Sequence, residues 1–270
     1  MVSTTLTNSV GMGPNTKGAR DEKLTLMTVR AENSVLAVVW NYACHPTAFS
    51  RVDALSADFP GVVRKRIRQQ IGRDAPVLFL QGFSGDTRPP GRKRIRTIKD
   101  VLLRVCLGPT FGDLDPADYE EWTESLAAAV AKCLGGPMVS IDGRLWSHRI
   151  AVPRGNFVKG GVSPAFVWFQ AVRFGDLTIV GVSAELVSEF SSPLRRLAAS
   201  RFVMPVGCLD ATVGYLPTAE VHREGGYEAG GFCASFGVDE LTPHASLETW
   251  SALVQLMAAT SKDNAADQGG

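Results

Sequence analysis

Residues 35–47 read VLAVVWNYACHPT, and this stretch decides the fold class. Its first eight residues are apolar on both faces, which is typical of a central strand covered by helices. Pro46 disfavours helical backbone at the residue before it, so the strand is expected to end in an extended conformation at His45. His45 therefore lies at the carboxyl end of a buried strand, the edge where α/β sheets form their sites.

The segments on either side of this strand predict its neighbours in the sheet. An apolar run at 24–30 and the turn at 31–34 predict a hairpin with the strand at 35–42. After His45, Asp58 is a candidate N-cap for a helix that runs to about Ile71 and stops at Gly72. The run PVLFL then predicts another buried strand, which ends in the glycine-bearing tip QGFSGD.

The rest of the chain mixes hairpins with strand–helix–strand units. Helices are expected near 98–106, 116–134, 188–199 and 246–260; strands near 143–152, 165–174, 177–183 and 202–206; a Gly-Asp turn at 175–176; and a Gly-rich loop region over 207–236. This order predicts an α/β (α+β mixed) fold, a mixed β-sheet covered by helices, with its site at the carboxyl ends of the strands. We expect a flexible arm over 1–22, one catalytic domain over 23–262 and a disordered tail over 263–270.

Composition bounds the function classes. The chain has 270 residues, 45% of them hydrophobic and 20% charged, with a formal net charge of +1, as in ordinary globular domains. The near-neutral charge argues against nucleic-acid binding, although the pentapeptide RKRIR occurs at 64–68 and 92–96. No apolar run is long enough to span a membrane, and no secretory signal is recognised, so localisation is left open. The five cysteines include no CxxC pair, which disfavours a thiolate zinc site.

Polar side chains gather directly after the predicted buried strands. They are His45, Asp86 in the glycine tip, Glu185, and a loop that carries Tyr215 and Tyr227. Such a set at one sheet edge would form a concave polar site. Histidine and glutamate are natural zinc ligands at neutral pH, and a tyrosine oxygen joins them if the metal lowers its pKa.

Taken together, five segments resemble the motifs of the neutral ceramidases, in family order over roughly residues 20–260. Residues 40–47 (WNYACHPT) resemble "NWFAxHPTS", and 56–61 (SADFPG) resemble "SSDNxG". Residues 79–89 (FLQGFSGDTRP) resemble "FAQxNxGDVSPN", and 183–187 (SAELV) resemble the "PGE" segment. Residues 214–218 (GYLPT) and 226–228 (GYE) resemble "GYxTT…RYEG", with the same spacing of twelve residues between the tyrosines.

The resemblance implies a zinc-dependent hydrolase of an N-acyl amide such as N-acylsphingosine or a related lipid amide. It assigns His45, Glu185 and Tyr215 as zinc ligands and Tyr227 as the group that holds the transition-state oxygen. Asp86 is expected to orient a ligand or to cap the glycine tip. The implied partner is a small-molecule or lipid amide substrate, and an exposed sheet edge would favour association.

Two departures from the family pattern affect the expected mechanism. The family's His-x-His motif, which gives the first zinc ligand, has no counterpart in these residues. The family's nucleophilic serine falls at Arg88, so attack by a zinc-activated water is the preferred version, and Arg88 would pair with an anionic part of the substrate.

Three competing hypotheses remain open at this point. The chain could be an inactive ceramidase-fold binding or scaffold domain, a nucleic-acid-binding protein that uses the RKRIR runs, or an unrelated metallohydrolase in which His45, Glu185 and Asp86 bind the metal. Only the ceramidase-like hypothesis requires the Tyr215 phenol.

Overall fold

The computed structural model describes residues 2–5, 10–11, 21–32, 34–49, 54–89, 97–99, 101–102, 115–160, 164–233, 237 and 239–267. The chain divides into two compact units, each described by itself. Unit 1 comprises Met1–Leu80 and Thr87–Val139, and unit 2 comprises Gln81–Asp86 and Ser140–Gly270. The glycine tip therefore belongs to the second unit, although the residues on both sides of it belong to the first.

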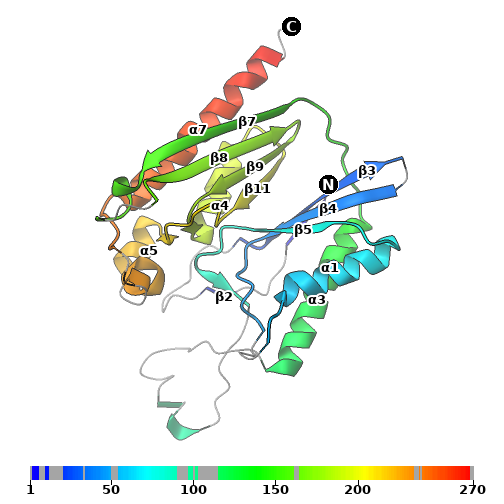
Figure 1. The fold of residues 1–270 in the computed structure, drawn as a ribbon, viewed down its shortest axis with the longest axis horizontal. Helices are drawn as coiled ribbons and strands as arrows, with labels where there is room; N and C mark the ends of the chain where they lie inside the picture. The colour runs from blue at the N-terminus through cyan, green and yellow to red at the C-terminus, as the bar shows by residue number, and fades with distance from the viewer. Residues whose placement is uncertain are drawn as a thin grey trace. The chain divides into compact units, whose positions relative to one another are not determined.

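Unit 1 is a four-stranded sheet with the strand order β1-β3-β4-β5, packed with two helices (Figure 1). The strands are β1 (Val2–Thr5), β3 (Lys23–Ala31), β4 (Ser34–Tyr42) and β5 (Val77–Gln81); the helices are α1 (Asp58–Ile71) and α3 (Pro116–Leu134). β1 and β4 each pair antiparallel with β3. The predicted hairpin at 24–42 is therefore confirmed.

The core of unit 1 is built around aromatic rings from the sheet and both helices. The ring of Phe59 in α1 lies 6.1 Å from that of Trp40, 5.3 Å from Phe79 and 5.4 Å from Trp122, all in edge-on geometry. Such pairs contribute about 0.5–1.5 kcal/mol each beyond the area that they bury. These ring contacts therefore pack α1 against the sheet and against α3.

Both helix ends in unit 1 follow the residues that predicted them. Gly72 takes a left-handed φ of 68° after α1, a conformation that glycine adopts without steric cost. Asp115 caps α3 by accepting a hydrogen bond from the backbone N–H of Ala117. The N-cap predicted at Asp58 is wrong, because Ala57 is the N-cap residue and the Asp58 side chain bonds elsewhere.

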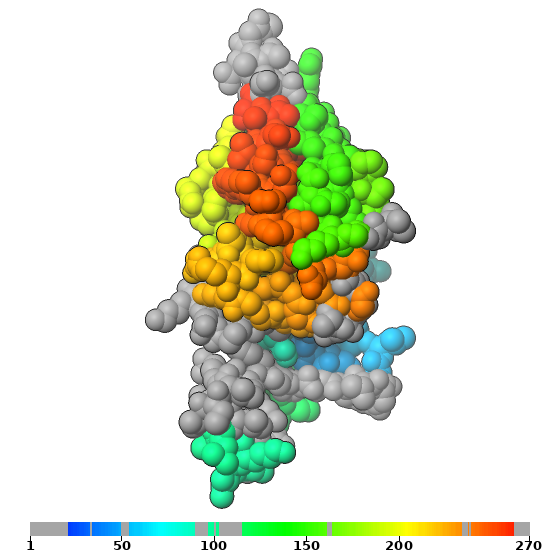
Figure 2. Space-filling view, turned by 90° about the vertical axis from the view of Figure 1, so that its left-hand side faces the viewer, coloured from blue at the N-terminus to red at the C-terminus, as the bar shows by residue number. Residues whose placement is uncertain are grey.

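Unit 2 is a mixed four-stranded sheet with the order β11-β9-β8-β7, and the long helix α7 packs on β7 and β8. The bounds are β7 (Leu145–Pro153), β8 (Phe166–Phe174), β9 (Leu177–Val182), β11 (Phe202–Val206) and α7 (Ala245–Asp267). Figure 2 shows α7, in orange and red, along the green strand β7. β9 and β11 run parallel while the other pairs are antiparallel. This mixed sheet with helices confirms the predicted α/β class.

Short elements replace the loop region predicted over 207–236. They are β12 (Tyr215–Leu216), α5 (Ala219–Glu224) and η3 (Tyr227–Gly231), and β12 pairs in parallel with β10 (Glu185–Leu186). A two-residue strand forms only because a distant segment pairs with it, and the sequence around it has no strand pattern of its own. The glycines of this region therefore led to the prediction of a loop. The predicted helix over 188–199 is likewise divided into a 3-10 turn, η2 (Ser188–Phe190), and α4 (Ser191–Leu197).

Other predictions fall wholly or partly outside the described residues. The second RKRIR run, at 92–96, lies outside them, and so does most of the helix expected at 98–106. Strands β1 and β2 (Val10–Gly11) fall in the stretch predicted as an arm, and α7 continues to Asp267. One catalytic domain over 23–262 stays a prediction. None of the helices in the described part of the chain is long and apolar enough to cross a membrane.

Candidate active site

The glycine tip lies against β10 in unit 2 and makes closely packed backbone contacts there. The Gly85 N–H donates to the Leu186 carbonyl at 2.8 Å, and the Gly207 N–H donates to the Gln81 carbonyl at 3.0 Å. A Cβ on Gly85 would lie only 2.9 Å from the carbonyl oxygen of Glu185. Glycine is therefore required at this position so that the tip can approach the strand that carries Glu185.

Asp86 fastens the end of the tip to the turn that follows β10. Its Oδ1 accepts from the Ser188 N–H at 2.7 Å, and its Oδ2 accepts from the Ser188 hydroxyl at 3.1 Å. Both residues are buried, so each hydrogen bond satisfies a polar group that has little access to water. Asp86 thus holds the backbone of the turn three residues after Glu185, and its expected part in catalysis stays a prediction.

Glu185 and Tyr215 are directly paired across the parallel ladder of β10 and β12. The Glu185 N–H donates to the Gly214 carbonyl at 2.8 Å, which fixes the register. Burial raises the pKa of the Tyr215 phenol well above its usual value, and the Glu185 carboxylate, which accepts its hydrogen bond, raises that pKa further. The Tyr215 phenol therefore keeps its proton and donates it in a hydrogen bond to the Glu185 carboxylate.

Tyr227 completes an aromatic corner beside this pair. Its ring centroid lies 5.5 Å from that of Tyr215 in edge-on geometry, and the rings of both tyrosines contact Phe232. Partial burial raises the pKa of Tyr227, and the carboxylates of Glu185 and Glu228 add to the shift. Tyr227 therefore keeps its proton at neutral pH and is able to donate a hydrogen bond.

His45 and Arg88 both lie in unit 1, where a backbone hydrogen bond connects the segments that carry them. The His45 N–H donates to the carbonyl of Thr87, the residue before Arg88, at 3.1 Å. The segment after His45 is held by Asp58, whose Oδ2 accepts from the N–H groups of residues 48 and 49 at 2.7 and 2.9 Å. Asp58 thereby connects the start of α1 to the strand end that carries His45.

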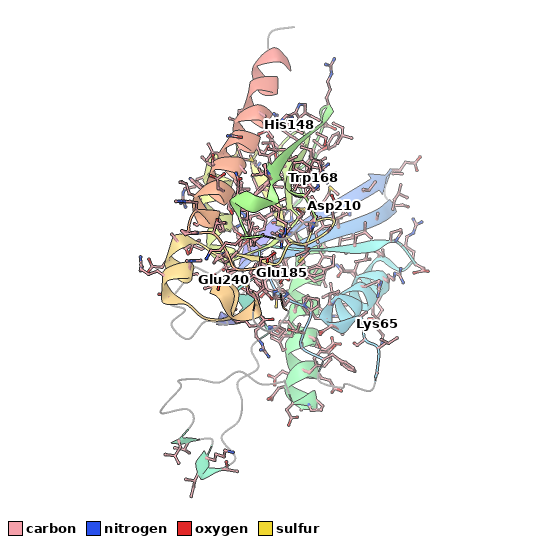
Figure 3. The ribbon with its side chains drawn as sticks, turned by 60° about the vertical axis from the view of Figure 1, so that its left-hand side comes forward. Lys65, His148, Trp168, Glu185, Asp210 and Glu240 are labelled. Carbon is pink, nitrogen blue, oxygen red and sulfur yellow. The ribbon has the colours of Figure 1, made fainter. Side chains whose placement is uncertain are left out.

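The structure thus sorts the predicted site residues into two groups. Glu185, Tyr215, Tyr227 and Asp86 belong to unit 2, and the first three form one cluster. His45 and Arg88 belong to unit 1. Among the described residues, no group of three or more His, Cys, Asp or Glu side chains is placed to hold a metal ion. Figure 3 labels Glu185.

Sequence reasoning missed three residues that shape these groups. Glu228 is 1% exposed, and its carboxylate contributes to the raised pKa of Tyr215 and of Tyr227. Ser188 fastens Asp86, and Asp58 holds the segment after His45. Glu228 stood inside a recognised motif and was given no role, because a single residue's burial has no periodic signal in the sequence.

Comparisons with known proteins agree with this architecture. No family model matches the chain, and no curated protein matches it. A solved structure described as "Ceramidase complexed with C2" is similar with a TM-score of 0.73 at 15% identity, covering 97% of this chain and 53% of that one. Another, of neutral ceramidase from Pseudomonas aeruginosa, gives 0.72 at 16% identity, with 97% and 52% covered.

These likenesses show the fold, which is ceramidase-like. The chain spans about half the length of the two structures that it matches. A shared fold does not by itself carry an activity, so function has to be argued from the site.

Proposed function

We propose that this chain carries part of the active site of a zinc-dependent hydrolase that cleaves an N-acyl amide, with a lipid amide as its substrate class. One observation carries the proposal: a ceramidase-like fold pairs Glu185 with Tyr215 and sets Tyr227 beside them. The carboxylate, the phenol and the adjacent hydrogen-bond donor are the groups that the ceramidase motifs assign to metal binding and to the transition state.

The donor set in unit 2 fits a zinc ion. The Tyr215 phenol donates a hydrogen bond to the Glu185 carboxylate, and a divalent cation that displaces the phenol proton would be bound by both oxygens. The ceramidase motifs assign His45 as the nitrogen ligand. Zinc bound by these residues would polarise the amide carbonyl or lower the pKa of a water molecule.

The remaining tasks of the reaction would fall to Tyr227, Asp86 and Arg88. Tyr227 keeps its proton and would donate a hydrogen bond to the oxyanion that develops on the amide carbon, an effect worth roughly 2.7–4 kcal/mol for one good donor. Asp86, through Ser188, would keep the backbone around Glu185 rigid. Arg88 takes the place of the family's serine, so water would attack directly and Arg88 would pair with an anionic part of the substrate.

Hydrolysis of a fluorescent N-acylsphingosine by the zinc-supplemented protein tests the proposal. Tyr227→Phe removes one donor without changing the ring, and we expect kcat to fall about 100- to 1,000-fold while zinc content stays unchanged. Tyr215→Phe is expected to lower zinc content as well as activity. Equal activity of Tyr227→Phe and the parent protein would overturn the assigned role, and full zinc content in Tyr215→Phe would favour an unrelated metallohydrolase.

A further inference from the structure

Two hollows on unit 1 meet at the C-terminal end of α1 and are lined by basic side chains. The larger has a volume of about 480 Å³ and is lined by Gly61, Arg64, Lys65, Arg68, Gln69, Gly72, Arg73 and Asp74. The smaller, of about 310 Å³, is lined by Arg30, Ser34, Val35, Gln70, Ile71, Arg73 and Leu134. Arg73 lines both, so the two hollows form one continuous basic surface.

The placement of these charges follows from the amphipathic sequence of α1. Its buried residues include Phe59, Val63 and Ile67, which pack into the core of unit 1. The opposite face presents Arg64 and Lys65, both exposed, and Figure 3 shows Lys65 on α1. Three of the four cations in the first RKRIR run, Arg64, Lys65 and Arg68, therefore line the larger hollow.

One of the arginines in the larger hollow is held in a fixed orientation. Arg68 Nη1 lies 2.8 Å from Asp74 Oδ1, and Arg68 Nε donates to the Ala75 carbonyl at 3.0 Å. Among the described residues that line the two hollows, Asp74 is the one carboxylate, and it is engaged in this pair. Beside this pair the described lining has four further cations, Arg30, Arg64, Lys65 and Arg73, so the surface is strongly positive although the whole chain has a net charge of only +1.

The geometry points to a docking site for the phosphate headgroups of anionic phospholipids, which would hold the protein at a membrane surface. Clustered Lys and Arg side chains attract anionic headgroups, and guanidinium groups pair with phosphate oxygens in bidentate fashion. Among the residues that line the hollows in the described part of the chain, none is aromatic. Nucleic-acid bases would thus have no ring on which to stack. The choice of a lipid surface rests on the proposed lipid amide substrate.

Cosedimentation of the full chain with vesicles tests this docking site. The vesicles contain phosphatidylcholine, with or without phosphatidylglycerol, and no amide substrate, so the readout is independent of hydrolysis. We expect binding only when phosphatidylglycerol is present. The triple variant Arg64→Gln/Lys65→Gln/Arg73→Gln changes exposed side chains and leaves the core intact, and its partition constant should fall about 100-fold, from the loss of three surface cations.

A matched variant in unit 2, Arg144→Gln/Arg196→Gln/Arg201→Gln, removes the same charge from exposed positions elsewhere. It should retain vesicle binding within about threefold, because the docking surface is unchanged. An equal loss in both triple variants would overturn the proposal, since binding would then follow net charge alone. Equal binding to both kinds of vesicle would also overturn it.

Two further arms separate the lipid surface from other sources of phosphate. Inorganic phosphate, compared with sodium chloride of equal ionic strength, should not release the protein from phosphatidylglycerol vesicles. Release by phosphate alone would show a site for a soluble anion and overturn the docking assignment. Tighter binding to a short DNA duplex than to the vesicles, lost in the α1 variant, would likewise replace the membrane by a nucleic acid.

Discussion

Replacing Gly85 by alanine tests how closely the glycine tip is packed against β10. The added Cβ would lie 2.9 Å from the Glu185 carbonyl oxygen and 3.1 Å from the backbone carbon of Leu186. Because these are backbone atoms, no side-chain rotation relieves the contact, and overpacking of this kind costs typically about 1–3 kcal/mol. Displacement of the tip would also weaken the Gly85–Leu186 hydrogen bond, which contributes about 0.5–1.5 kcal/mol.

Gly155 provides the matched control in the same unit. No atom of the described residues lies within 4 Å of its added Cβ, so Gly155→Ala should be neutral or stabilise the protein by about 0.4–1 kcal/mol through the unfolded chain. We therefore expect the free energy of unfolding of Gly85→Ala to lie about 2–4 kcal/mol below that of Gly155→Ala. Urea unfolding followed by far-UV circular dichroism measures this difference. Two variants within about 0.5 kcal/mol of each other would refute the close approach of the tip to β10.

Asp86→Ala should lower the free energy of unfolding by about 2–4 kcal/mol, because it removes the acceptor of the buried N–H and hydroxyl of Ser188. The control Asp142→Ala, at an exposed position, should change that free energy by less than about 0.5 kcal/mol. Similar losses for the two variants in urea unfolding would contradict the buried hydrogen bonds between Asp86 and Ser188. Asp58→Ala should cost about 3 kcal/mol, since three backbone N–H groups lose their acceptor. Asp74→Ala breaks only an exposed ion pair and should cost about 0–1 kcal/mol. Equal thermal midpoints for these two variants would show that Asp58 does not hold its loop.

Much of the fold could be predicted because its signals are local. The hairpin of β3 and β4 follows from apolar patterning around a short turn, and Gly72 and Gly135 mark the ends of α1 and α3. The turn between β8 and β9 was predicted from Gly175, which takes a φ of 53°. Each of these features is encoded within a few residues of the place where it acts.

The missed features depend on contacts between distant segments. β12 is two residues long and exists because β10 pairs with it across about thirty positions. Asp58 has the sequence context of an N-cap, yet its carboxylate is used by the loop after His45. The burial of Glu228 follows from the packing around it. In each case tertiary packing overrides what the local sequence favours.

The candidate site shows the same division. Strand-end placement and the ceramidase-like motifs selected Glu185, Tyr215 and Tyr227, and the structure gathers these three in unit 2. The resemblance alone supplied their roles, because a carboxylate beside two phenols is compatible with several chemistries. The participation of His45 and Arg88 in the same site stays a prediction.

The central proposal is that Glu185 and Tyr215 bind a zinc ion, and zinc content measured by elemental analysis tests it most directly. The purified chain, supplied with zinc and dialysed, should retain about one ion, and Glu185→Ala and Tyr215→Phe should each lose it. Both variants should keep their far-UV circular dichroism spectra, so that loss of metal is separated from loss of fold. Retention of zinc in either variant, or no zinc in the parent protein, would contradict the account.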